Sequence, residues 1–150
     1  MVQKIPDGFT TLTPSLTVRG AAEAIALYTQ ALGAKELYRT EMPGDSGKIM
    51  HACLMIGNSK IFLNDASPDM NCGKTSASSF YVYLEDVDAA FKRARDAGLE
   101  EAWPVSDMFW GDRMGVVKDR FGISWTLATH VRDVSSEEME EAKKNFCKAA

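Results

Sequence analysis

The chain has two histidines, His51 and His130, and imidazole is the side chain whose ordinary pKa lies nearest neutral pH. Either could act as a general base, and with Cys53 or Asp112 they could form a metal site. A lone histidine on a strand is more often a hydrogen-bonded structural residue. No second group at catalytic spacing is identifiable from the sequence. His51 alone is therefore named as a candidate catalytic residue.

A run of alternating residues offers a second kind of chemistry. Trp110, Asp112 and Met114 alternate along an expected strand, so Trp110 could close one end of a cavity and Asp112 could anchor a polar group of a ligand. An alternative is structural. Asp112 and Arg113 could pair in the hairpin while Trp110 packs at a subunit interface.

Tyr81 and Tyr83 also share one strand face by alternation. Their flat, amphipathic rings could hold a planar ligand. Cross-strand packing explains the same two residues equally well.

The elements that must position these residues repeat along the chain. Residues 10–65 predict a βαβββ unit, and residues 79–131 predict a second one after a linker at 66–78. Glycines that end a helix or make a turn recur about 65 residues apart, as in Gly33 and Gly98. The expected strands are Thr10–Val18, Lys35–Glu41, Lys48–Ile56 and Lys60–Asp65 in the first unit, and Ser79–Leu84, Leu99–Val105, Phe109–Lys118 and Ile123–His130 in the second.

Helix signals accompany the strands. Ala21, Ile25, Tyr28 and Leu32 recur at helical spacing, and Asp86 is a suitable N-cap for the second helix. A third helix is expected at about 135–147, where Ser135 and Glu138 form a capping box. Its apolar face could pack on its own domain or on a second subunit.

Composition narrows the partners. The 150 residues carry a net charge of -4 and suit a single domain at 1–150. Lys and Arg are scattered, which argues against nucleic acid and anionic membranes. No leader or membrane span is apparent, and three cysteines without CxxC spacing indicate reduced thiols, so we expect a cytoplasmic protein that binds a small molecule.

Alternation also sorts side chains between the helix and a cavity. The residues expected to face the helices are Leu12, Leu16, Val18, Ile61, Leu63, Phe80, Val82, Leu84, Ile123, Trp125 and Leu127. His51 lies on a strand that is apolar on both faces, and we place its more polar face toward the cavity.

The chain resembles the vicinal oxygen chelate superfamily, which includes glyoxalases, bleomycin resistance proteins and dioxygenases. The resemblance rests on the runs Val18–Ile25, Glu85–Ala90 and Asp119–Gly122, while Phe109–Arg113 and Ala128–Val131 are similar to its PhnB-like, glyoxalase-like branch. It implies an α+β fold in which two βαβββ modules form a half-open, barrel-like sheet around one cavity. The resemblance also implies a homodimer, which open sheet edges favour.

Metal-dependent members carry four ligands at positions that correspond here to Thr13, Phe62, Ser79 and Thr126. None of these side chains offers an imidazole or a carboxylate, so we expect no metal and no other cofactor.

The leading hypothesis is therefore a small-molecule binding protein with a metal-free cavity. The alternative is a lyase, isomerase or dioxygenase-type enzyme that uses a displaced divalent metal or acid–base catalysis by His51. The residues expected to line the cavity are Thr13, His51, Phe62, Tyr81, Trp110, Asp112, Thr126 and His130.

Overall fold

The computed structural model of the protein describes residues 2–44, 46–67 and 74–149. The chain divides into two compact units. Unit 1 contains the residues up to Ser78 together with Arg120–Ile123, and unit 2 contains Ser79–Asp119 and the residues from Ser124 onward.

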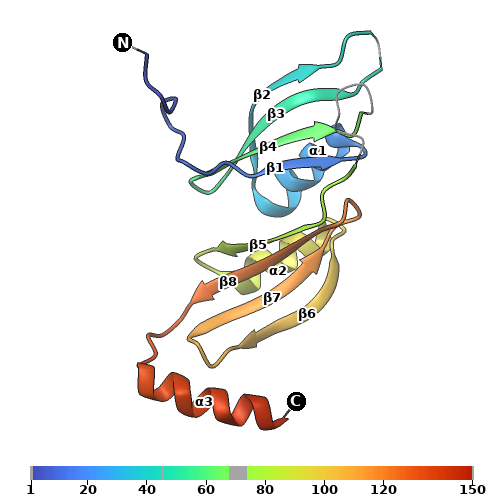
Figure 1. The fold of residues 1–150 in the computed structure, drawn as a ribbon. Helices are drawn as coiled ribbons and strands as arrows, with labels where there is room; N and C mark the ends of the chain where they lie inside the picture. The colour runs from blue at the N-terminus through green and yellow to red at the C-terminus, as the bar shows by residue number, and fades with distance from the viewer. Residues whose placement is uncertain (1, 45, 68–73, 150) are drawn as a thin grey trace. The chain divides into compact units, whose positions relative to one another are not determined.

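Unit 1 has one helix and a four-stranded mixed sheet (Figure 1). The strands lie in the order β1-β4-β3-β2, with β1 parallel to β4 and the other neighbours antiparallel. The elements along the chain are β1 (Ser15–Val18), α1 (Ala21–Leu32), β2 (Lys35–Glu41), β3 (Ile49–Ile56) and β4 (Ser59–Asp65).

Unit 2 repeats this order and adds a C-terminal helix. Its sheet has the strand order β5-β8-β7-β6. Its elements are β5 (Ser78–Tyr83), α2 (Val87–Asp96), β6 (Glu100–Asp107), β7 (Asp112–Lys118), β8 (Ile123–His130) and α3 (Ser136–Ala149). The α+β class, the repeated βαβββ order and the C-terminal helix are confirmed. In the described part of the chain, no helix is long and apolar enough to cross a membrane.

Each sheet has one face toward the helix of its own unit and an opposite face, here called the front face. Alternation predicted the helix-facing core well, because successive strand residues point to opposite faces. Buried as predicted are Leu16, Val18, Ile61, Leu63, Ile123, Trp125 and Leu127, while Phe80, Val82 and Leu84 are half-buried.

The helix boundaries follow the predicted signals. Gly33 ends α1 in the left-handed conformation, with φ of 66°. The Asp86 side chain accepts a hydrogen bond from the backbone N–H of Ala89 at the start of α2. Ser135 and Glu138 form the reciprocal bonds of a capping box before α3.

Two strand predictions were too long. β1 begins at Ser15 rather than Thr10, and Leu12 is 79% exposed instead of facing the helix. Pro14 has no N–H to extend the ladder, which explains the late start. Similarly, β7 begins at Asp112, and Trp110 lies in the turn before it.

The predicted linker is partly ordered by the sheet. Ser76 exchanges hydrogen bonds with Thr17 of β1, through its backbone N–H in one direction and its side-chain oxygen in the other. Cys72 lies outside the described residues. Cys53 is a buried free thiol, as expected for a core residue.

The start of α1 depends on a residue far away in sequence. Gly20 precedes the helix and offers no side-chain cap. Instead the buried carboxylate of Asp65 accepts bonds from the backbone N–H groups of Gly20 at 2.9 Å, Ala21 at 3.0 Å and Ile49 at 2.8 Å. One side chain thus joins α1, β3 and β4.

We predict that Asp65→Asn lowers the free energy of unfolding by about 2 kcal/mol, because an amide nitrogen would face a backbone N–H and leave buried donors without an acceptor. Urea denaturation followed by circular dichroism measures this loss. Asp107→Asn changes a carboxylate whose side chain is 73% exposed and serves as the control. Equal stability of the two variants would contradict the role given to Asp65.

Candidate functional site

The most connected polar group on a front face is the Asp112 carboxylate at the start of β7. Asp112 is 3% exposed. Its Oδ2 accepts bonds from the Tyr81 hydroxyl at 2.7 Å and the Tyr83 hydroxyl at 3.0 Å, and its Oδ1 lies 2.8 Å from Nδ1 of His130. Nε1 of Trp110 donates to the Tyr81 oxygen at 3.5 Å. These five residues are called the Asp112 cluster below.

Strand register brings the cluster together. Asp112 on β7 is paired with His130 on β8, and Tyr81 and Tyr83 come from β5 on the other side of β8. Gly111 positions the turn that carries Trp110. Its carbonyl accepts the N–H groups of Val131 and Arg132, and a Cβ at this residue, with φ of 100°, would lie 2.1 Å from the Arg132 carbonyl oxygen.

The hydrogen bonds determine the charges in the cluster. Burial favours the neutral acid at Asp112, but the bonds from His130, Tyr81 and Tyr83 together lower its pKa. Burial also raises the pKa of Tyr81 to about 12, so the hydroxyl stays protonated and donates. The bond to Asp112 raises the pKa of Tyr83.

His130 lies between two carboxylates. Its Nε2 is 3.0 Å from Oδ1 of Asp133, which is fully exposed, and its Nδ1 meets buried Asp112. The hydrogen bonds to Asp133 and then to Asp112 raise the pKa of His130. Because a carboxylate only accepts, each ring nitrogen must carry a proton to make both bonds, which is the imidazolium form.

The front face of unit 1 carries a row of rings instead of a polar cluster. His51 packs against Phe62 with ring centroids 4.6 Å apart and against Tyr38 at 5.8 Å. Phe9, from the segment before β1, packs on Phe62 at 5.7 Å, and Nζ of Lys60 lies 3.9 Å from the centre of the Phe9 ring. The row is therefore partly covered by the chain itself.

The eight predicted cavity residues fall into both units. In unit 1, His51 and Phe62 are in contact, whereas Thr13 lies before β1 and on no strand. In unit 2, Tyr81, Trp110, Asp112 and His130 come together. Thr126 lies four residues before His130 on β8, about 13 Å along the strand.

The structural alternative for Asp112 is wrong in one respect. Arg113 does not pair with Asp112, because neighbouring residues of β7 point to opposite faces. The Arg113 guanidinium bonds instead to Asp88 of α2 and to Asp107.

The positions that the family resemblance suggests for metal ligands do not fit a metal. Phe62 is packed between the rings of His51 and Phe9, and Ser79 and Thr126 offer neutral hydroxyls. Within residues 2–44, 46–67 and 74–149, no group of three or more His, Cys, Asp or Glu is placed to hold an ion. The two nitrogens of His130 bond to different carboxylates instead of converging on one point.

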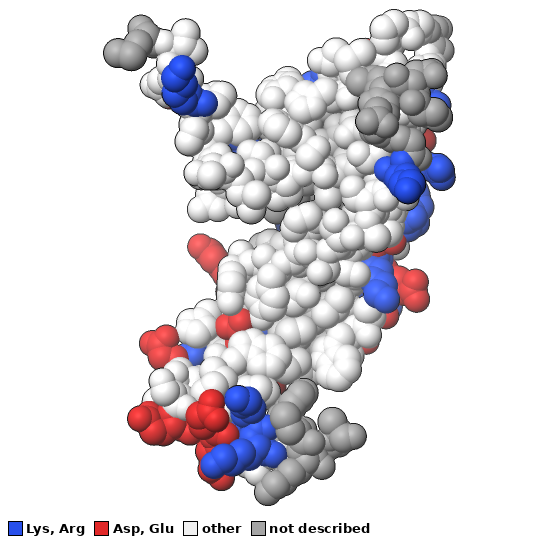
Figure 2. Space-filling model, viewed as in Figure 1, with Lys and Arg blue, Asp and Glu red and all other residues white. Residues whose placement is uncertain are grey.

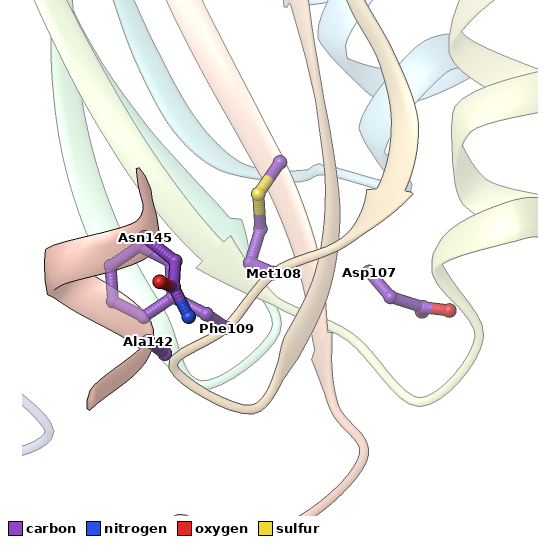
Figure 3. A pocket seen from close by; sticks show the side chains of 5 residues that line it. All are labelled: Asp107, Met108, Phe109, Ala142 and Asn145. Atoms are coloured by element: carbon purple, nitrogen blue, oxygen red, sulfur yellow. The ribbon is translucent and has the colours of Figure 1, made fainter. Parts of the chain in front are cut away.

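A separate pocket of about 370 Å³ lies between α3 and the turn that joins β6 to β7 (Figure 3). In it Phe109 points toward Ala142 and Asn145 of α3. The pocket contains none of the eight predicted residues. Its lining is Asp107, Met108, Phe109, Ala142 and Asn145.

The sequence analysis named Tyr83 as a possible ligand contact beside Tyr81 but did not include it among the eight expected cavity residues, and it did not single out Asp133. Alternation placed Tyr83 on the correct face, so the signal was present. The pairing of Asp112 with His130 could also have been predicted from the sequence. A turn at 119–122 sets Lys118 opposite Ser124, and six residues further from the turn on each strand Asp112 lies opposite His130. No sequence signal marks Asp133, which follows the strand.

We predict that His130 stabilises the fold more in acid than in alkali. Its folded pKa is raised, so its contribution is complete below its unfolded value near 6.5 and is lost as pH rises through the folded value. The loss of stability in His130→Gln should be larger at about pH 5.5 than at about pH 9, in urea denaturation. Asp112 remains ionised throughout this range because its pKa is lowered from 3.8.

Asp133→Asn is the matched variant, because it removes the first cause of the raised pKa while keeping His130. In that background the difference between the two pH values should shrink. A His130→Gln effect that is constant with pH, or that grows toward alkaline pH, would contradict the assignment.

Comparison with known proteins agrees with this architecture. The model of the Glyoxalase/Bleomycin resistance protein/Dioxygenase superfamily matches residues 10–127. The uncharacterized protein Rv0887c of Mycobacterium tuberculosis is 40% identical over 139 residues, 87% of this chain and 81% of that protein. The crystal structure of TioX from Micromonospora sp. ML1 is similar in fold, with a TM-score of 0.69 at 24% identity over 82% of this chain and all of that chain.

A PhnB protein from Bacillus cereus, described as a putative 3-demethylubiquinone-9 3-methyltransferase, shows the same fold. Its TM-score is 0.63 at 23% identity, and the match covers 80% of this chain and 99% of that one. The expectation of a PhnB-like, glyoxalase-like fold is confirmed. The chain belongs to the Glyoxalase/Bleomycin resistance protein/Dioxygenase superfamily.

Proposed function

We propose that this protein binds a small organic molecule on the front face of unit 2, and that this binding requires no metal. The observation that carries the proposal is the Asp112 cluster. Tyr81 and Tyr83 are 45% and 63% exposed, yet their hydroxyls are held by one buried carboxylate. Aromatic surface with a few fixed polar groups is the usual composition of a small-molecule site.

The cluster is organised before any ligand arrives. The rings of Tyr81 and Tyr83 lie 5.1 Å apart, tilted by 49°, and Trp110 approaches Tyr81 from the adjacent turn. Side chains already held in place lose less conformational entropy when a ligand covers them. The hydrogen bonds among Tyr81, Tyr83, Asp112 and His130 therefore favour ligand binding without large rearrangement.

The surroundings favour an uncharged or weakly charged ligand body. In the view of Figure 2, charged side chains gather at the edges of the sheets and over α3, and the sheet surfaces between them are largely uncharged. The charged groups of α3 include Glu137, Glu138, Glu140, Glu141, Lys143 and Lys144. Apolar and aromatic contact would supply most of the affinity.

The enzyme alternative that relied on His51 has less support. A general base needs a polar route for its proton. The His51 ring packs against the rings of Phe62 and Tyr38, and among the described residues its side chain makes no hydrogen bond. The family description includes both resistance proteins and enzymes, so membership alone does not distinguish the two functions.

We predict that fragment-sized aromatic molecules bind at Trp110. A panel of neutral, cationic and anionic fragments is titrated against nitrogen-15-labelled protein, and at least one should shift the Trp110 indole N–H signal in a saturable way. Trp110→Phe assigns that signal. Tyr83→Ala should weaken the best fragment about tenfold, since it removes a ring worth roughly 1 to 2 kcal/mol of contact.

Tyr38→Ala is the control, because Tyr38 is likewise an exposed tyrosine, at 45% against 63% for Tyr83, but belongs to unit 1. It should leave the affinity unchanged. Absence of a saturable shift at Trp110 with every fragment, or equal losses in both variants, would contradict the proposal.

Metal independence has its own test. Protein produced with added Zn, Mn, Fe and Ni should retain less than about a tenth of an equivalent of any of them after dialysis, because its described side chains do not form a ligand set. Chelator should leave fragment affinity unchanged. Stoichiometric metal that is lost in His51→Ala would instead support a displaced metal site.

A further inference from the structure

The direction of the hydrogen bonds in the Asp112 cluster restricts what a ligand can offer. Both tyrosine hydroxyls donate their single proton to Oδ2 of Asp112. A phenol that has donated its proton has only lone pairs left. The oxygens of Tyr81 and Tyr83, residues that are 45% and 63% exposed, therefore offer only lone pairs to a ligand, although a tyrosine hydroxyl can ordinarily donate or accept.

The oxygen of Tyr83 is the freer of the two. The Tyr81 oxygen already accepts the long bond from Trp110, whereas no bond to the Tyr83 oxygen is found among the described residues. Tyr83 is also the more exposed residue. A ligand group that donates hydrogen bonds would find its acceptor there.

Charge points in the same direction. Asp112 and Asp133 are both carboxylates, and His130 between them can offset one of the two, so the group carries net negative charge with His130 either protonated or neutral. The two arginines that are adjacent in sequence to Asp112 and Asp133 are paired with other carboxylates. Arg113 is bound to Asp88 and Asp107, and Arg132 lies 4.0 Å from Glu138 of α3.

Among the described residues of β7, none that shares the orientation of Asp112 places a compensating cation close to the cluster. On β7 the residue of matching orientation that carries positive charge is Lys118, six residues from Asp112 and about 20 Å along the strand. The aromatic rings add to the preference, because the face of a tyrosine or tryptophan attracts a cation. Acceptor oxygens, ring faces and a buried carboxylate are thus gathered at one place.

We infer that the ligand of unit 2 carries a protonated amine, which donates to the Tyr83 and Tyr81 oxygens and lies against the aromatic rings with Asp112 as buried counter-charge. This inference rests on the proposed small-molecule function and names the chemical class of the ligand. An anionic group at the same place would meet lone pairs and a carboxylate.

Three probes of similar size test the ligand class: phenethylammonium, phenethyl alcohol and hydrocinnamate. Each is titrated at neutral pH while the Trp110 indole signal is followed by NMR. Phenethylammonium should bind about tenfold or more tightly than the alcohol, since hydrogen bonds to charged groups are stronger than those between neutral groups. Hydrocinnamate should bind most weakly.

Two variants separate the acceptor from the charge. Tyr83→Phe keeps the ring and removes the acceptor oxygen, so it should lower phenethylammonium affinity about tenfold and leave hydrocinnamate no weaker. Asp112→Asn keeps the shape but removes the charge and one acceptor oxygen, and should reduce the preference for the amine. Tyr38→Phe makes the same chemical change in unit 1 and should have no effect.

The outcomes distinguish this inference from the proposed function. If the alcohol or hydrocinnamate binds at Trp110 as tightly as the amine, the amine inference is overturned and small-molecule binding stands. If Tyr83→Phe and Tyr38→Phe behave alike, the amine does not use the Tyr83 oxygen and the inference is again overturned. If no probe and no member of the wider panel binds at Trp110, both proposals are overturned.

Discussion

A buried carboxylate must be surrounded by donors, and this constraint shapes both units of the protein. Asp65 in unit 1 and Asp112 in unit 2 are the two carboxylates buried in the described part of the chain. Asp65 is satisfied by backbone N–H groups, so its charge holds elements together. Asp112 is satisfied by the side chains of Tyr81, Tyr83 and His130, so its charge organises groups that face outward.

The duplicated architecture shows how this difference arises. Asp65 ends β4 and His130 ends β8, and the two residues are 65 positions apart, the same spacing as the matching glycines. In unit 1 that strand end must cap α1, because Gly20 has no side chain to do so. In unit 2, Asp86 and the hydroxyl of Thr129 bond to the first turn of α2. The last residue of β8 is then available for other contacts, and it contacts Asp112.

Much of the fold was predictable because strand alternation and helix caps are local signals. Leu16 and Val18, or Ile61 and Leu63, can be assigned to a face from their neighbours alone. The failures at Leu12 and Trp110 came where a strand begins later than its residue pattern suggests, in one case after Pro14 and in the other after the turn before Asp112. The residue at which a strand begins to pair depends on its partner strand, which lies far away in sequence.

The candidate site was harder to predict, since its members depend on pairing between strands. Tyr81, Trp110, Asp112 and His130 were each singled out, but their convergence on one carboxylate requires the registers of β7 with β8 and of β5 with β8. The charged state of His130 could not be inferred either. It depends on Asp133, whose side chain is fully exposed and carries no pattern of its own.

The two front faces differ in a way that explains why unit 2 carries the stronger case for a ligand. In unit 1 the ring of Phe62 is already covered by Phe9, and the Lys60 ammonium lies over the Phe9 ring, so aromatic surface and a cation partner are both supplied from within the chain. In unit 2 the rings of Tyr81 and Tyr83 remain exposed beside two carboxylates, Asp112 and Asp133, that share one histidine. A protonated amine from outside would give unit 2 the same type of contact that Lys60 already makes in unit 1.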